Sequence, residues 1–108
     1  MSVNYVSAVP LASKNTATLT GGYAVVSTGL TEACFLLRIT NDSNRDLTIS
    51  YDLGVTDHDY VVSGTSLEIN AQTNSSPSGK VALFRKGLPI YVKAAAGTGY
   101  VYIAGYYS

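Results

Sequence analysis

Apolar and polar residues alternate along the middle of the chain with the two-residue period of β-strands. Leu47, Ile49 and Tyr51 are separated by small polar residues, and Leu67 and Ile69 are separated by Glu68. Clusters of Asn, Asp, Gly and Ser stand between these runs, and such residues favour turns because their side chains or free backbones bend the chain locally. The pattern predicts short antiparallel strands with one buried face.

Further strands are predicted on both sides of this region. They cover residues 16–20, 23–27, 35–39, 80–84, 88–93 and 100–107. The run 35–39 is almost continuously apolar, which favours a central strand covered on both faces or a strand leaving a bulge. Residues 74–79 (NSSPSG) read as a loop. Residues 1–13 are predicted to be an arm or a first edge strand, because Pro10 lacks a backbone donor.

About eight strands at this spacing predict a single all-β domain over residues 1–108. We expect an antiparallel β-sandwich, with a jelly roll as the preferred topology and an immunoglobulin-like sandwich as the second. No segment shows the 3.6-residue period of an amphipathic helix.

Composition favours a subunit of an assembly. Charged residues make up only 13% of the chain and the formal net charge is zero, so like-charge repulsion gives the surface little protection against association. The seven Lys and Arg residues are scattered, which argues against a nucleic-acid partner. We expect no signal peptide and no membrane partner, and therefore synthesis in a cytosol. The single cysteine, Cys34, lies among apolar residues and is expected to be a small buried hydrophobe.

An acidic cluster is the place where chemistry is most plausible. Asp52, Asp57 and Asp59 offer oxygen ligands of the kind that calcium prefers, but their spacing does not match an EF-hand and no Glu closes the set. Because Asp is also a standard turn residue, we predict no metal and no cofactor. His58 would need a nucleophile, Ser63 or Thr65, to act as a catalytic base, and we expect a hydrogen-bonded turn histidine instead. The chain is predicted not to be an enzyme.

Tyrosines are the candidate contact residues. The predicted interface set is Tyr5, Tyr91, Tyr100, Tyr102, Tyr106 and Tyr107. The last strand and the strand before it are expected to form an aromatic face, which suits an intersubunit contact, simple cross-strand pairing, or a shallow sugar site completed by residues 52–59. The pair Arg85-Lys86 reads as a hairpin turn, with a neighbour's acidic loop as an alternative partner.

The chain also resembles a family of viral proteins. The resemblance rests on the segments ITNDSNRDLTISYD, TDHDYV, GTSLEIN, VALFRKG and IYVKAAAGTGYVYIAGYY, and extends from about Ile39 to Tyr107. In these turn-and-strand patterns the chain resembles small β-sandwich virion proteins of tailed bacteriophages: head-decoration (cement), fibre-base, and collar or tail-associated subunits.

The resemblance implies a non-enzymatic structural subunit located in the virion. Its partners would be other virion proteins and further copies of itself, with a trimer favoured. The family pattern supplies no catalytic residues. The alternative is a carbohydrate- or receptor-binding module, and an esterase or glycosidase is a more distant third.

Overall fold

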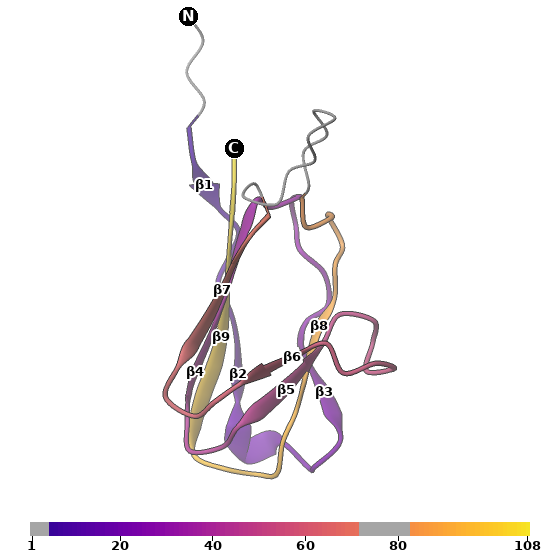
Figure 1. The fold of residues 1–108 in the computed structure, drawn as a ribbon, viewed down its shortest axis with the longest axis vertical. Helices are drawn as coiled ribbons and strands as arrows, with labels where there is room; N and C mark the ends of the chain where they lie inside the picture. The colour runs from indigo at the N-terminus through magenta and orange to yellow at the C-terminus, as the bar shows by residue number, and fades with distance from the viewer. Residues whose placement is uncertain (1–4, 72–82) are drawn as a thin grey trace, which may run out of the picture.

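Two antiparallel sheets form the protein in the computed structural model, which describes residues 5–71 and 83–108 (Figure 1). The five-stranded sheet contains β1 (Ser7–Ala8), β2 (Ala12–Asn15), β4 (Leu36–Ser43), β7 (Ser66–Asn70) and β9 (Gly99–Tyr107). The four-stranded sheet contains β3 (Tyr23–Ser27), β5 (Leu47–Ser50), β6 (Asp59–Val61) and β8 (Ile90–Lys93). The predicted all-β sandwich is therefore confirmed. No helix in these residues is long and apolar enough to span a bilayer.

The strand pairs are nested around one loop. Strand β5 pairs β6, β4 pairs β7, β3 pairs β8 and β2 pairs β9, so each pair encloses the one before it along the chain. This long antiparallel ribbon is wrapped on itself, because β4 also pairs β9 and β5 also pairs β8. The loop between β5 and β6 is consequently the tip of the ribbon.

The hydrophobic core fills the space between the two sheets. Alternate residues of the inner strands are fully buried, as the sequence period predicts: Leu37, Ile39, Leu47, Ile49, Ile90, Val92, Val101 and Ile103. Each such side chain stabilises the fold by about 1.5–3 kcal/mol relative to an exposed position. Cys34 is a free, fully buried thiol in this core, as predicted.

Two local predictions are wrong. Residues 16–20 do not form a strand: Thr16–Thr18 is a 3₁₀ helix, because the Asn15 side chain accepts a hydrogen bond from the Ala17 N–H at 3.0 Å. The run 35–39 is not covered on both faces, since burial alternates along β4 and Arg38 points outward to an ion pair with Glu68 at 3.3 Å.

Two further predictions fall partly or wholly outside the described residues. The loop at 74–79 lies outside them. The strand at 80–84 is described only from Leu83, and there Phe84 forms an isolated bridge with Cys34.

Candidate functional site

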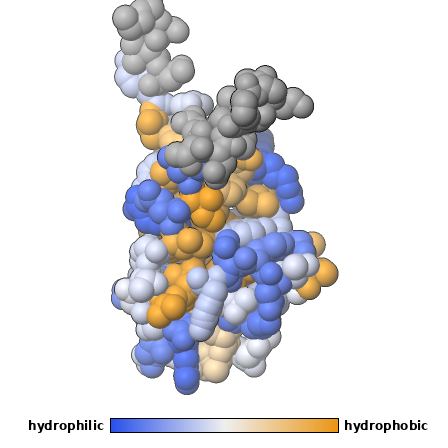
Figure 2. Space-filling view, viewed as in Figure 1, coloured by the Kyte–Doolittle hydropathy of each residue, from blue (hydrophilic) through white to orange (hydrophobic). Residues whose placement is uncertain are grey.

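The loop at residues 51–58, here called the tip loop, projects from the four-stranded sheet (Figure 1). Its end carries two apolar side chains, Leu53 and Val55, which are 64% and 84% exposed. Figure 2 shows hydrophobic surface at this tip, at the right of the view. Apolar side chains at the end of a protruding loop are candidates for a contact with another molecule, because nothing in the fold itself covers them.

Side-chain hydrogen bonds hold the tip loop in one shape. The buried Ser50 hydroxyl donates to Asp52 Oδ1 at 2.7 Å and accepts from the Gly54 N–H at 3.0 Å. The same Asp52 oxygen accepts the Thr56 N–H at 2.9 Å. Ser and Asp are suited to this task because their short side chains reach nearby backbone donors. The loop is therefore pre-organised before any partner arrives.

The tip loop also stores backbone strain. Leu53 has a φ of 66°, a left-handed conformation that costs a non-glycine residue on the order of 1–3 kcal/mol. Gly54 follows with a φ of 88°, and a Cβ there would lie 2.9 Å from the Cβ of Tyr23 in β3. Leu53 and Gly54 are the central residues of a tight turn that the Val55 N–H closes by donating to Asp52 O at 3.4 Å, and this turn leaves the Leu53 side chain exposed.

His58 closes the base of the loop. The His58 Nδ1 accepts the backbone N–H of Tyr51 at 3.0 Å, and the backbone N–H of His58 donates to Ile49 O at 2.8 Å. The centroids of the His58 and Tyr51 rings lie 5.4 Å apart. The expected hydrogen-bonded turn histidine is confirmed. Both candidate nucleophiles donate to backbone oxygens instead: the Ser63 hydroxyl to Ser43 O at 2.5 Å and the Thr65 hydroxyl to Val62 O at 2.6 Å.

The three candidate metal-binding carboxylates are occupied separately. Asp52 binds loop donors, Asp57 accepts from the Tyr23 hydroxyl and lies 3.3 Å from Lys93 Nζ, and Asp59 accepts from the Tyr51 hydroxyl at 2.6 Å. Within residues 5–71 and 83–108, no group of three or more His, Cys, Asp or Glu side chains is placed to hold a metal ion. The three carboxylates therefore hold the tip loop and its base in place, each through its own hydrogen bonds or ion pair.

These contacts make stability depend on pH at both extremes. Hydrogen bonds from Ser50 and Thr56 lower the pKa of Asp52 to about 2, from an ordinary 3.8. Desolvation, then the hydrogen bond to Asp57, raises the pKa of Tyr23 from 10.0 to about 12. The Asp52 contribution is complete above pH 3.8 and lost as the pH falls toward 2, whereas the Tyr23 contribution is complete below pH 10 and lost as the pH rises toward 12.

We therefore expect the urea midpoint of unfolding to fall in both of these pH intervals. Asp52→Asn should reduce the acid slope, and Tyr23→Phe should reduce the alkaline slope. Tyr23→Phe should also remove part of the acid slope, because the Tyr23 hydroxyl is the largest cause that lowers the pKa of Asp57. Asp52→Asn should slightly reduce the alkaline slope, because the charge of Asp52 helps to raise the pKa of Tyr23. Slopes that match those of the wild-type protein in both variants would contradict the assignment.

The tyrosines of the predicted interface do not share one face. Tyr100, Tyr102 and Tyr106 lie on the outer face of the five-stranded sheet, where the first two rings stack at 6.0 Å and Arg38 lies 5.7 Å from the third ring. Tyr91 belongs to β8 in the other sheet, between buried Ile90 and Val92.

The expected aromatic face joining the last two strands is therefore wrong. The sugar site that was to combine Tyr91, Tyr100 and Tyr102 with residues 52–59 is likewise not assembled. Two other members of the predicted set are placed differently again. Tyr107 packs against the core, and Tyr5 is 78% exposed just before β1.

The Arg85-Lys86 pair forms the predicted turn, closed by the Leu88 N–H donating to Arg85 O at 3.1 Å. A second hydrogen bond, from the Gly87 N–H to Leu30 O at 2.7 Å, ties this turn to the body of the protein. A groove runs between the turn and the tip loop. We call it the flank groove; it is lined by Thr28, Tyr51, Asp52, Leu53, Arg85, Gly87 and Pro89.

Sequence reasoning identified the acidic loop and the basic turn separately but missed the flank groove. The residues that line the groove come from three segments that are distant in the sequence. The alternation of apolar and polar residues within one strand cannot show that such segments lie close together.

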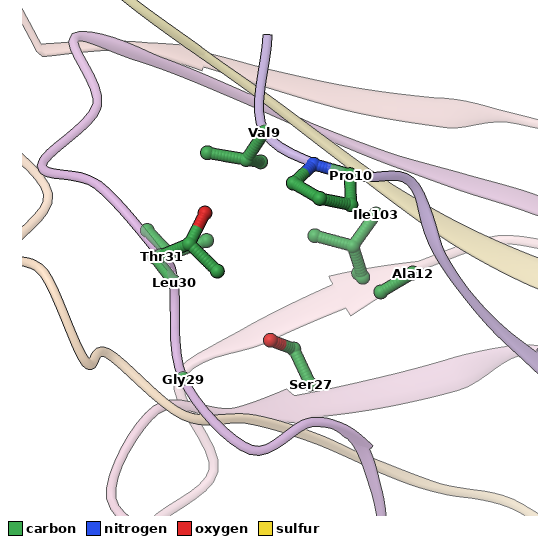
Figure 3. A pocket seen from close by; sticks show the side chains of 8 residues that line it. All are labelled: Val9, Pro10, Ala12, Ser27, Gly29, Leu30, Thr31 and Ile103. Atoms are coloured by element: carbon green, nitrogen blue, oxygen red, sulfur yellow. The ribbon is translucent and has the colours of Figure 1, made fainter.

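A second, smaller cavity lies where the β1–β2 connection meets the segment after β3 (Figure 3). Its volume is about 50 Å³, and Val9, Leu30 and Ile103 give it an apolar lining. Ligand pockets usually measure roughly 300–1,000 Å³, so this space is a packing gap. The flank groove and the tip loop beside it remain the candidate functional site.

Comparison with known proteins adds no family assignment: no family model, no curated protein and no solved structure matches this chain.

Proposed function

We propose that the protein is a non-enzymatic structural subunit of a bacteriophage virion that acts through protein–protein contacts. The observation that carries this proposal is the hydrogen-bonded tip loop. It exposes the apolar side chains of Leu53 and Val55 to solvent although the backbone of Leu53 is held in an unfavourable left-handed conformation. The low charge of the chain supports the same conclusion, because a nearly uncharged surface favours association.

We further propose that the sandwich is a jelly roll. The support is the strand order, in which β2-β9-β4-β7 faces β3-β8-β5-β6. Such an order arises when one long antiparallel ribbon is rolled into two four-stranded sheets. The rolled ribbon brings its tip loop to the flank of the molecule, where it is accessible to a neighbour.

The N-terminal segment is a second proposed contact. Tyr5 and Val6 are 78% and 65% exposed, and β1 pairs only its two residues with the end of β9. An exposed apolar segment held by so few pairs is suited to bind an adjacent subunit. Tyr100, Tyr102 and Tyr106 stay predicted interface residues on the outer face of the five-stranded sheet.

The solution mass of the purified protein tests the proposed function. We expect an oligomer whose mass does not change over a hundredfold range of concentration in light scattering, with a trimer as the expected number of subunits. An interface of this stability buries roughly 1,200 Å² or more. A monomer throughout the range would contradict a self-assembling subunit.

A further inference from the structure

We infer that the flank groove is the docking site for the tip loop of a second copy of this chain. The inference rests on the proposed function and names the partner and the residues of one of its contacts. It is carried by three properties of described residues: the shape of the tip loop, the lining of the flank groove, and the charges on each.

The tip loop has the form of an inserting element. Val55 is its most exposed apolar residue and does not line the flank groove of its own chain. The hydrogen bonds of Ser50, Asp52 and Thr56 hold the loop, so docking does not require the loop to be ordered first. A pre-organised loop loses little conformational entropy on binding, which favours affinity.

The flank groove has the form of a receiving surface. Tyr51, Pro89 and Leu53 supply apolar area, and Gly87 keeps the basic turn free of a side chain that would narrow the space. The backbone hydrogen bonds of Gly87 and Leu88 hold this side of the groove in place. Because Val55 does not line the groove of its own chain, it can occupy a flank groove only on a second molecule.

Charge complementarity identifies the occupant as the tip loop. The tip loop contains Asp52 and Asp57 and no Lys or Arg. The flank groove is lined by the basic Arg85, with Lys86 next to it, and by the acidic Asp52, so these three residues together are net positive. In the part of the chain that the structure describes, no ion pair joins Arg85 or Lys86 to a carboxylate. An acidic loop from a second copy would compensate this basic turn, and like-charge partners would be rejected.

The tip of one copy contacts a different surface, the flank groove, on another copy. Two copies can exchange tips about a two-fold axis, or successive copies can repeat the contact and close into a ring such as a trimer. Both surfaces lie on the same flank of the molecule, since Leu53 belongs to the tip loop and also lines the groove beside it.

Three variants test the inference by light scattering. Leu53→Asn removes apolar area at a position where Asn tolerates a left-handed backbone, so the fold should be at least as stable while assembly weakens. Val55→Ser removes the tip side chain, and Arg85→Glu reverses the charge on the receiving side. Each should raise the dissociation constant at least about tenfold, the effect of an important interface residue.

Matched controls separate docking from general surface effects. Val62→Ser changes an exposed valine outside the tip loop and groove, and Lys14→Glu reverses a charge on β2. Both should leave the dissociation constant within about twofold. A urea unfolding curve for every variant confirms that it is folded before its mass is interpreted.

Mixing tests the pairing of the tip of one copy with the flank groove of another. The Val55→Ser chain keeps an intact flank groove, because Val55 does not line it, and the Arg85→Glu chain keeps an intact tip. An equimolar mixture should form dimers at concentrations where each variant alone is a monomer.

The experiments distinguish failure of the proposed docking site from failure of the proposed function. A wild-type oligomer that persists unchanged in all three variants overturns the docking site and leaves the proposed function standing. A mixture that stays monomeric overturns the pairing of tip with groove. A wild-type monomer at every concentration overturns both the docking site and the self-assembling subunit.

Discussion

Gly99→Ala is expected to lower the free energy of unfolding by at least about 3 kcal/mol. Gly99 begins β9 opposite Ser43 and has a φ of 107°, a conformation that L side chains rarely adopt. A Cβ at this position would overlap the carbonyl oxygen of Asp42 and lie 2.8 Å from Ser43 Cα. The change therefore combines backbone strain with a clash against backbone that cannot move without disturbing the pairing of β4 and β9.

Gly64→Ala is the matched control for this prediction. Gly64 also has a positive φ, 77°, but a Cβ there meets no atom within 4 Å. Gly64→Ala should therefore lower the free energy of unfolding only by the cost of a left-handed backbone at a residue with a side chain, about 1 kcal/mol. Urea denaturation of both variants measures the difference, and equal losses would show that the close approach of Gly99 to β4 has no energetic consequence.

Asn41→Ala is expected to destabilise the protein by about 3 kcal/mol, because it leaves buried polar groups without partners. Asn41 is only 1% exposed, and its Nδ2 donates to Arg45 O at 2.7 Å and to Val61 O at 2.9 Å. It thereby joins β4 of the five-stranded sheet to β6 of the four-stranded sheet. Its Oδ1 also accepts from the Ser43 hydroxyl at 2.5 Å.

Asn44→Ala provides the comparison for Asn41. Asn44 is exposed, and its Oδ1 accepts the Thr98 N–H at 2.8 Å, which water can replace in the variant. We expect a loss of about 1 kcal/mol or less. Thermal unfolding followed by circular dichroism ranks the two, and an Asn44→Ala protein as unstable as Asn41→Ala would contradict the importance of burial.

The alternation of residues predicted which side chains face inward, and the structure confirms it along β4, β5, β8 and β9. The same alternation could not assign Tyr91 and Tyr100 to sheets. Strands β8 and β9 are neighbours in sequence, yet β8 pairs β3 and β5 whereas β9 pairs β2 and β4. The period of a strand reports which way a side chain points relative to its own sheet, and the identity of that sheet depends on hydrogen bonds to distant residues.

The prediction of a strand at residues 16–20 failed for a local reason. Thr is favoured in strands, but the Asn15 side chain accepts the Ala17 N–H and the Thr18 hydroxyl donates to the Asn15 carbonyl oxygen, and these hydrogen bonds tighten the backbone into a 3₁₀ turn. Thr16 is then buried, and its hydroxyl donates to Gly99 O at 3.0 Å. That distant acceptor belongs to the tertiary structure and has no signature near Thr16.

The sequence by itself determined the all-β class, most of the strands, the burial of Cys34 and the structural role of His58. These properties depend on side-chain period and turn chemistry, which act over a few residues. The tertiary structure alone decided the strand order, the separate surroundings of Asp52, Asp57 and Asp59, and the flank groove. Each of these arises where rolling the ribbon brings distant segments together, as when Leu53 and Arg85 come to line one groove.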